Sequence, residues 1–186
     1  MNIADNLLQL RIDQDLYLRQ ATVRDAAALY QIIDSQRAYL REWLPFIDMS
    51  NSVNVTELYL QSMTAPGNTT DLLFVMVYQQ EVVGLIGFKE IDNFNKKLEI
   101  GYWLSEVMQG KGIMRKGCTA MVRHAFDKME MNRVQIKVGV GNNKSSNIPK
   151  KLGFSFEGVL REAEFLNGRY HDLEVYSLLK REWESV

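Results

Sequence analysis

The sequence predicts a mixed α/β (α+β) fold with a central, mostly antiparallel sheet of about six or seven strands flanked by helices. Residues 72–78 and 82–91 are consecutive runs of β-branched and aromatic side chains, which predicts an antiparallel pair. A segment with helical periodicity then lies between strand-like runs at residues 96–104 and 133–140. This order predicts one parallel crossover within the sheet.

The N-terminal third is expected to hold one strand followed by helices. Residues 15–21 alternate apolar and polar side chains like a half-buried strand. Thr22 and Asp25 have capping-box spacing, which predicts a helix start. Helical spacing continues from there to Pro45 and resumes at residues 54–63.

The middle of the chain is expected to form the sheet and its crossover helix. A tight turn joins the runs at residues 72–78 and 82–91, and the strand at residues 96–104 leads into a glycine-rich loop. The helix after the loop has a core-facing apolar stripe with spacings of three and four. This stripe consists of Met114, Cys118, Met121, Val122, Ala125, Phe126 and Met129.

The C-terminal part is expected to add strands and one short helix. Residues 133–140 read as a strand, and a short helix should end at Gly153. Asn167-Gly168 lies between apolar runs and is a strong hairpin signal.

Composition narrows the function classes. With 186 residues, 46% of them hydrophobic, the chain is expected to form one domain over residues 1–186. A net charge of -1 gives no basic field for nucleic acid.

Cys118 is the single cysteine, which excludes an intrachain disulfide and fits a reducing compartment. The N-terminus lacks the features of a signal peptide or membrane span, so we expect a cytoplasmic protein without membrane partners. His124 and His171 lack metal-ligand spacing, so no metal is expected.

The glycine-rich loop at residues 109–118 (QGKGIMRKGC) suggests an anion site. Three glycines and three basic residues lie between a strand and a helix. A nucleotide-triphosphate loop would need a lysine where Cys118 stands, and a dinucleotide loop would need a glycine where Arg115 stands. The pattern Q/R-x-x-G-x-G/A fits at Gln109 and Gly112, with Met114 in place of the last small residue. Backbone N–H groups in such a loop hold a pyrophosphate, unless the glycines only cap the helix.

Further motifs give the loop a family context. The segments are EIGYWL, QGKGI, NRVQIKVGVGNNKSS, KLGFSFEGVLRE and YSLLKREWE, and they include Asn142, Ser145 and Lys151 in the pattern N-x-x-S-x-x-x-x-x-K-L-G-F. In order and spacing the chain resembles the GCN5-related N-acetyltransferase (GNAT) superfamily. Within it, the chain is similar to the RimJ/RimL-type ribosomal-protein N-terminal acetyltransferases, over about residues 15–184.

The resemblance implies acetyl-coenzyme A as the acetyl donor. Its pyrophosphate would lie at the loop, and its pantetheine amides would pair with backbone near Trp103 and Leu104, where the strand splays from its neighbour. One backbone N–H there would act as the oxyanion donor. The residues expected at the cofactor are Trp103, Leu104, Gln109, Gly110, Lys111, Gly112, Ile113, Met114, Arg115, Asn142, Ser145 and Lys151.

The resemblance also implies the catalytic pair. Ser145 would donate to the departing sulfur, and Glu164 would polarise or deprotonate the acceptor amine. Ser145 could instead cap the short helix, and Glu164 could be a solvated hairpin charge. Glu99 is the rival base and Tyr176 the rival acid. Cys118 lies in the apolar stripe and reads as core rather than as a nucleophile.

The acceptor is expected to be the N-terminal α-amine of a protein, with a small polyamine or an aminoglycoside as the alternative. A non-catalytic acyl-coenzyme A-binding module would need the loop but neither Ser145 nor Glu164. Relatives in this group often form homodimers, so a homodimer is a further expectation. A rim of acids on the strands would attract a cationic peptide. These acids are Glu90, Asp92, Glu99, Glu162, Glu164, Asp172 and Glu174.

Overall fold

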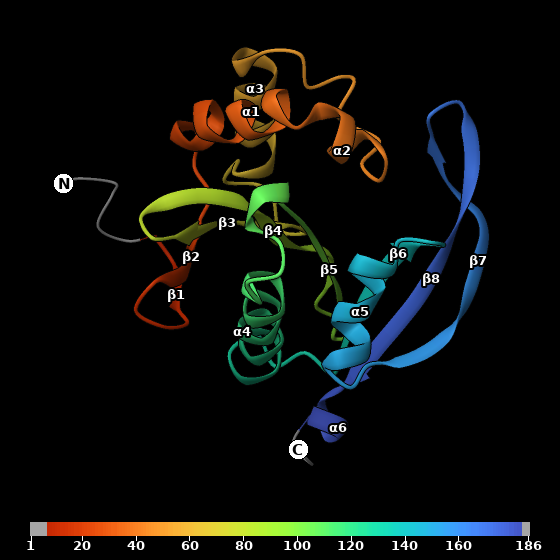
Figure 1. The fold of residues 1–186 in the computed structure, drawn as a ribbon. Coiled ribbons are helices and arrows are strands. Elements are labelled where there is room, and N and C mark those ends of the chain that lie inside the picture. The colour runs from red at the N-terminus through yellow and green to blue at the C-terminus, as the bar shows by residue number, and fades with distance from the viewer. Residues whose placement is uncertain (1–6, 184–186) are drawn as a thin grey trace.

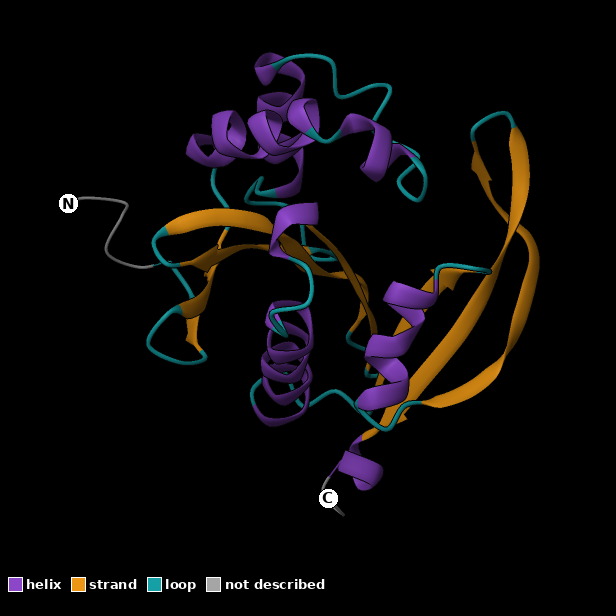
Figure 2. Cartoon of the chain, in the orientation of Figure 1, coloured by secondary structure: helices purple, strands orange, loops and turns teal. Residues whose placement is uncertain are grey.

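A computed structural model describes residues 7–183 and contains one sheet with helices on both faces (Figures 1 and 2). The strands are β1 (Gln9–Arg11), β2 (Leu16–Gln20), β3 (Leu72–Tyr78), β4 (Glu81–Asp92), β5 (Lys97–Leu104), β6 (Arg133–Gly139), β7 (Ser155–Leu166) and β8 (Arg169–Leu179). The helices are α1 (Ala26–Ser35), α2 (Arg37–Arg41), α3 (Val53–Met63), α4 (Ile113–Asp127), α5 (Asn143–Lys151) and α6 (Lys180–Trp183), with 3-10 turns η2 (Val23–Asp25) and η3 (Glu106–Met108).

The sheet has the order β1-β2-β3-β4-β5-β6-β8-β7, with eight strands rather than the predicted six or seven. Every neighbouring pair is antiparallel except β5 and β6, which the crossover through α4 makes parallel. The parallel pairing begins at Lys97↔Arg133 and ends at Glu99↔Gln135. Beyond Glu99 the two strands diverge, so residues 100–104 of β5 face a gap on the β6 side.

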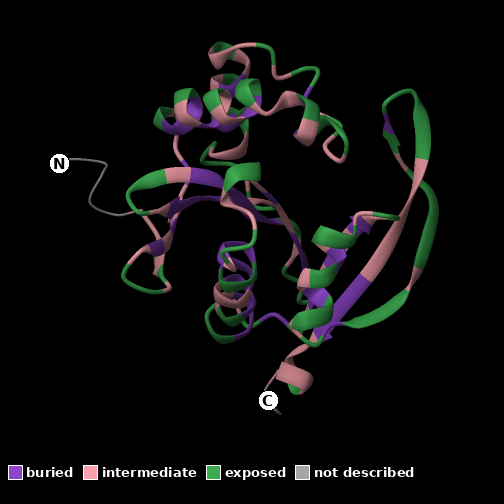
Figure 3. Ribbon diagram, viewed as in Figure 1, coloured by how far each residue is buried: buried purple, intermediate pink, exposed green. Residues whose placement is uncertain are grey.

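Each face of the sheet has its own apolar core, and the buried residues concentrate on the strands and on the helices that cover them (Figure 3). Successive side chains on a strand point to opposite faces. Ile100 of β5 therefore joins the core beneath α4, and Trp103 joins the core beneath α1 and α3. The same alternation puts the polar side chains of β4, β5 and β6 on the Trp103 face, beyond the part that α1 and α3 cover.

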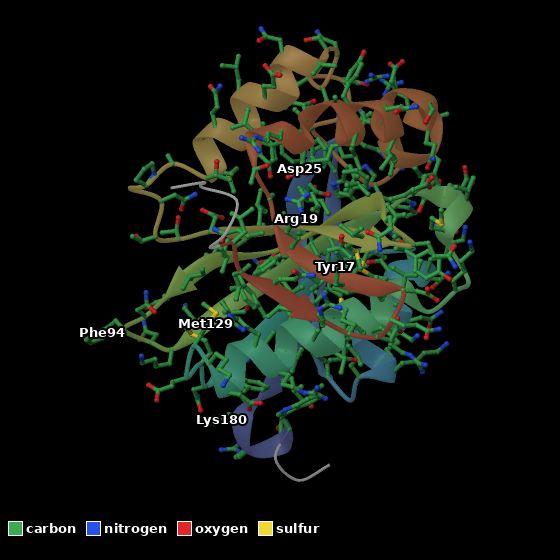
Figure 4. The ribbon with its side chains drawn as sticks, turned by 90° about the vertical axis from the view of Figure 1, so that its left-hand side faces the viewer. Tyr17, Arg19, Asp25, Phe94, Met129 and Lys180 are labelled. Carbon is green, nitrogen blue, oxygen red and sulfur yellow. The ribbon has the colours of Figure 1, made fainter. Side chains whose placement is uncertain are left out.

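The first helical segment begins with the predicted capping box. The backbone N–H of Thr22 donates to the Asp25 carboxylate at 2.7 Å, and Arg19 of β2 pairs with the same carboxylate (Figure 4). The expected helix to Pro45 is divided, because α1 ends at Ser35 and α2 begins at Arg37. The intervening Gln36 has a φ of -127°, outside the helical range.

The C-terminal hairpin is longer than its sequence signal. Asn167 and Gly168 both have positive φ, 52° and 81°, as a type I′ turn requires. The sequence signal covers only the residues around Asn167-Gly168, but β7 begins at Ser155. Register shifts between Phe156 and Gly158, and again before Glu164, break the alternation that would have marked the strand.

None of the helices between residues 7 and 183 combines the length and apolar character that a membrane crossing requires. Over the same residues, His, Cys, Asp and Glu side chains form no group of three or more that could hold a metal ion.

Candidate active site

The glycine loop has the backbone conformation of an anion site. Gly110 and Gly112 have φ values of +77° and +74°, and a Cβ on either would meet no heavy atom within 4 Å. Both glycines are therefore needed for their left-handed conformation, and the space beside them is open. Gly112 is the N-cap of α4, so the first N–H groups of α4 lack intrahelical partners and can face an anion.

The other loop residues divide between core and surface. Ile113 and Met114 are buried in the core beneath α4, so Met114 projects into that core. Lys111 and Arg115 are exposed, whereas the Lys116 ammonium lies 2.7 Å from the Asp13 carboxylate. The third glycine, Gly117, has a packing role that the motif does not reveal: a Cβ there would lie 2.6 Å from Met76 Cε.

The Gln109 side chain joins three elements. Its Nε2 donates to the Tyr39 hydroxyl of α2, and its Oε1 accepts from Lys144 Nζ of α5 at 2.9 Å. The Gln36 side chain, shortly before Tyr39 in the chain, contacts the segment before the loop. It donates to Ser105 Oγ at 2.8 Å and accepts from the Glu106 backbone N–H at 2.6 Å. The Gln109 amide, expected at the cofactor, is thus already engaged with protein, and the loop is connected to the break between α1 and α2.

Ser145 lies at the β5–β6 gap and is held by a neighbour that the sequence analysis missed. Its Oγ is 3.2 Å from Tyr102 Oη, and Tyr102 Oη donates to the Ser145 carbonyl at 3.1 Å. Burial raises the pKa of Tyr102, so this phenol stays neutral. Asn142 caps α5 by accepting from the Ser145 N–H at 3.1 Å, so the alternative role of Ser145 as the helix cap is wrong. Only the position of Tyr102 in the strand before the loop could have singled it out.

The remaining cofactor candidates lie around the gap. Leu104 ends β5, while the Trp103 side chain points away from α4 and α5 into the opposite core. Trp103 Nε1 is buried and has no hydrogen-bond partner among residues 7–183. Lys151 is exposed at the C-terminal end of α5, the opposite end from Asn142.

Glu99 is enclosed by cations on the opposite face of the sheet. It is 4% exposed, with Oε1 2.9 Å from Lys89 Nζ and Oε2 2.8 Å from Lys137 Nζ. Gln135 Nε2 lies 3.4 Å from Oε2, and Lys137 also approaches Glu90 at 3.4 Å. Both Glu99 oxygens therefore already accept from ammonium groups, so neither is open to an incoming amine.

Glu164 shares this face but keeps an open carboxylate. It pairs with His171 across the hairpin, and alternation along β8 puts His171 on the same face as Val175, the partner of Lys137. Burial raises the Glu164 pKa, while the charges of Lys89 and His171 lower it and that of Glu99 raises it. The structure gives Glu164 no hydrogen bond or ion pair among residues 7–183.

The other two reactive side chains are parts of the core. Tyr176 is 2% exposed on the α5 side of the sheet, and its hydroxyl donates to Glu174 at 2.6 Å. Its pKa is raised by burial and by that hydrogen bond. Cys118 is fully buried, and burial raises the pKa of its thiol. It therefore packs as the apolar stripe predicted.

A cleft of about 750 Å³ separates the α2 region from the tip of the β7–β8 hairpin. Asn167 Nδ2 spans part of it, donating to the Arg41 carbonyl at 3.0 Å. Glu164 immediately precedes the hairpin residues that line the cleft. The lining residues are Ala38, Arg41, Glu42, Leu44, Pro45, Asp48, Phe165, Leu166, Asn167 and Gly168.

The predicted acidic rim is only partly present. Glu90 and Glu99 pair with lysines, and Asp92 accepts from its own turn at the Asn95 N–H, 2.8 Å away. Asp172 accepts from the Glu162 backbone, and Glu174 accepts from Tyr176. Most of these acids therefore already accept from lysines, backbone N–H groups or a tyrosine hydroxyl.

Comparisons with known proteins agree with this arrangement. A family model described as an acetyltransferase (GNAT) domain matches residues 15–155. YdaF of Bacillus subtilis, named as a candidate ribosomal N-acetyltransferase, is 34% identical over 180 residues, covering 94% of this chain and 96% of that protein. The ribosomal-protein-serine acetyltransferase of Escherichia coli is 30% identical over 171 residues, covering 90% of this chain and 94% of its own.

A solved structure extends the likeness to the whole fold. RimL, a ribosomal L7/L12 alpha-N-protein acetyltransferase in complex with coenzyme A, superposes with a TM-score of 0.88 at 29% identity. The superposition covers 92% of this chain and 98% of the RimL chain. The family match at residues 15–155 includes the glycine loop and Ser145, and the relatives also cover the strand of Glu164. The chain belongs to the GNAT acetyltransferase family.

Proposed function

We propose that this acetyl-coenzyme A-dependent N-acetyltransferase acts on the N-terminal α-amine of a protein, of the ribosomal type. One observation carries the proposal: neutral donors line the β5 segment that diverges from β6, and on the other face of the sheet Glu164 has no hydrogen bond or ion pair among residues 7–183. The E. coli relative is named for a ribosomal-protein serine, which supports this class of acceptor.

The residues present fit coenzyme A. Residues 100–104 of β5 have no β6 partner, so their outer backbone groups can pair with the pantetheine amides. The left-handed Gly110 and Gly112, with the N-terminus of α4, suit the pyrophosphate, and the exposed Lys111 and Arg115 add positive charge. When bound, acetyl-coenzyme A supplies the activated acetyl group.

The neutral side of the site stabilises the acetyl and thiol groups. A β5 backbone N–H near Trp103 or Leu104 acts as the oxyanion donor, because it is fixed before the reaction and needs no reorganisation. Ser145, oriented by Tyr102, donates a hydrogen bond to the departing thiolate. Asn142, a further cofactor residue of the sequence pattern, helps to position Ser145 by capping α5. Lys151 contributes an exposed positive charge at the other end of α5.

The charged side accepts the proton of the amine. A protein α-amine has a pKa of about 7.7–8.0, so a carboxylate is a sufficient base, directly or through water. Glu164 has the open carboxylate for this role, and its raised pKa brings it closer to that of the amine. Glu99 is the weaker candidate because two ammonium groups occupy its oxygens.

The cleft between α2 and the hairpin tip suits a chain more than a compact amine. It is about 750 Å³ and runs beside the segment that follows Glu164, so residues after the acceptor N-terminus can lie in it. A small polyamine would leave much of it empty.

Acetyl transfer to a matched panel tests the proposal. Labelled acetyl-coenzyme A is offered with a peptide starting with Ser, the same peptide with a blocked N-terminus, and spermidine. The free peptide should be acetylated on its α-amine with the highest kcat/KM, and the blocked peptide should be inert although it contains lysines. Faster turnover of spermidine or an aminoglycoside than of every peptide would refute the ribosomal type of acceptor. Acetyl-coenzyme A binding without thiol release for any amine offered would point to the non-catalytic binding module.

A further inference from the structure

We infer that Trp43 is a specificity-determining residue for the acceptor: its indole lies across Gly139 and Gly141 and limits the size of the acceptor's first side chain. The inference rests on the proposed function, since it takes a protein N-terminus as the acceptor. It narrows that acceptor to a chain whose first residue is small, such as Ser.

The indole of Trp43 lies against glycine backbone at the end of β6. A Cβ on Gly139 would be 3.3 Å from Trp43 Cε3 and 3.4 Å from Cζ3, and a Cβ on Gly141 would be 3.8 Å from Cη2. These three atoms belong to the six-membered ring, which therefore spans both glycines. The φ of Gly139 is outside the left-handed region, so this glycine serves space rather than conformation. A side chain at Gly139 would push the ring away from the sheet.

The strand register places the indole on the face of the sheet that carries Glu164. Val138 belongs to the core beneath α4, so alternation turns Gly139 to the opposite face. Gly139 pairs with Leu173 of β8. His171, which pairs with Glu164, lies two residues before Leu173 and shares its face. The ring is therefore on the side from which the acceptor amine reaches Glu164.

Trp43 also lies between the cleft and the β5–β6 gap. It follows α2, and its neighbours in the chain, Arg41, Glu42, Leu44 and Pro45, line the cleft. The Trp43 indole instead reaches Gly139, where β6 ends on the far side of the gap from β5. An acceptor whose chain lies in the cleft and whose amine enters the gap must therefore pass this ring.

The seat of the ring makes it a limit on size. Trp43 is half-buried, so part of the indole surface is open to the acceptor. The ring is rigid and has the backbone of Gly139 and Gly141 beneath it, so it cannot recede to admit a larger group. One extra methylene that a pocket cannot accommodate changes kcat/KM by roughly 10- to 200-fold. We therefore expect a first residue such as Ser to be preferred over Leu.

Two peptides that differ only in their first residue, Ser or Leu, test the inference with labelled acetyl-coenzyme A. The wild type should prefer the Ser peptide. Trp43→Ala should raise the ratio of kcat/KM for Leu over Ser by at least about 10-fold. Trp43→Tyr, which keeps an aromatic ring, should retain most of the preference. Phe94→Ala, at an aromatic residue that is 93% exposed in the turn between β4 and β5, is the control and should leave the ratio unchanged.

The ratio separates selection from structure. If Trp43 only held α2 in place, its loss would lower both rates alike and leave the ratio at the wild-type value, which would overturn the inference. Gly139→Ala keeps the decision available if Trp43→Ala fails to fold. Its Cβ would force the ring outward by a few tenths of an ångström, so the preference for Ser over a Thr-initiated peptide should increase. An unchanged preference in a folded Gly139→Ala would also overturn the inference.

The wild type distinguishes this inference from the proposed function. Equal kcat/KM for the Ser and Leu peptides would overturn the role of Trp43 and leave the proposed function standing. Turnover of spermidine with no acetylation of either peptide would overturn the proposed function, and the inference with it.

Discussion

The two faces of β5 carry chemically different halves of the site. On the side of α4 and α5, the groups are neutral: backbone of residues 100–104, the Ser145 hydroxyl and the buried Tyr102 phenol. On the other side, Lys89, Glu99 and Glu164 place charges within mutual influence. The neutral side binds the same cofactor in every turnover, so fixed backbone is enough. The charged side must accept a proton from the amine, so the turnover rate should change with pH and with the replacement of a single charged residue.

The largest effect expected is the loss of one catalytic group from either face. Ser145→Ala and Glu164→Gln should each lower kcat by about 10²–10⁴-fold, the usual contribution of a positioned acid or base. Coenzyme A affinity, measured by calorimetry, should change far less, because both residues act on the reacting centre. A large loss of affinity with normal kcat would mean that these side chains only bind the cofactor.

Gly112→Val should disrupt the neutral face by changing its backbone. A β-branched residue at a φ of +74° is strained by about 1–3 kcal/mol, and relief of that strain would turn the loop N–H groups away from the pyrophosphate. Acetyl-coenzyme A should raise the melting temperature of the wild type and barely that of the variant. Gly67→Val, at an open position without positive φ, is the control. A shift with ATP equal to that with acetyl-coenzyme A would contradict the loop assignment.

Tyr39→Phe should weaken the connection between the loop and α2. It removes the hydroxyl that accepts from Gln109, and Lys144 remains the partner of Gln109. A loss of one hydrogen bond is worth about 0.5–1.5 kcal/mol, so coenzyme A affinity should fall by up to about 10-fold. Isothermal titration checks this. Affinity equal to that of the wild type would mean that α2 is independent of the loop.

Cys118→Ser should change stability rather than activity. A hydroxyl buried in the core without a partner costs about 1–3 kcal/mol, measured as the free energy of unfolding in urea. Turnover should remain close to wild type once the folded fraction is equal. Loss of turnover in a folded variant would make Cys118 a reactive group after all.

The smallest effect expected is a pH-dependent stabilisation by Glu164→Gln. The Glu164 pKa is raised in the folded chain, so the wild type loses stability as pH rises from the unfolded pKa through the folded one. Glutamine has no such loss. The melting temperature of the variant relative to the wild type should therefore increase as the pH rises above about 4. A relative decrease would mean that the folded chain favours the Glu164 carboxylate.

Features with local chemistry could be predicted from the sequence. The Gln109–Gly112 loop, the striped helix after it and the Asn167-Gly168 turn each follow from neighbouring residues, and the structure contains all three. The family resemblance supplied Ser145 and Glu164, whose roles stay proposals.

Features that join distant strands could not be predicted. Lys89, Glu99 and Lys137 come together only because β4, β5 and β6 are adjacent, and no spacing in the chain records this. The same holds for the contact of Gln109 with Tyr39. The acidic rim is only partly present for a related reason, since a sequence gives the charge of an acid but not the lysine or backbone N–H that it already binds.

The central claim is that the acetyl group moves directly from acetyl-coenzyme A to the amine, without a covalent enzyme intermediate. A single-turnover experiment tests this claim most directly. Enzyme with labelled acetyl-coenzyme A is mixed with a Ser-initiated peptide or with none, and free thiol and label are followed together. Thiol should appear only with the peptide, and all transferred label should be on its α-amine. Thiol release without peptide, with label retained on Cys118 or any other side chain, would contradict direct transfer.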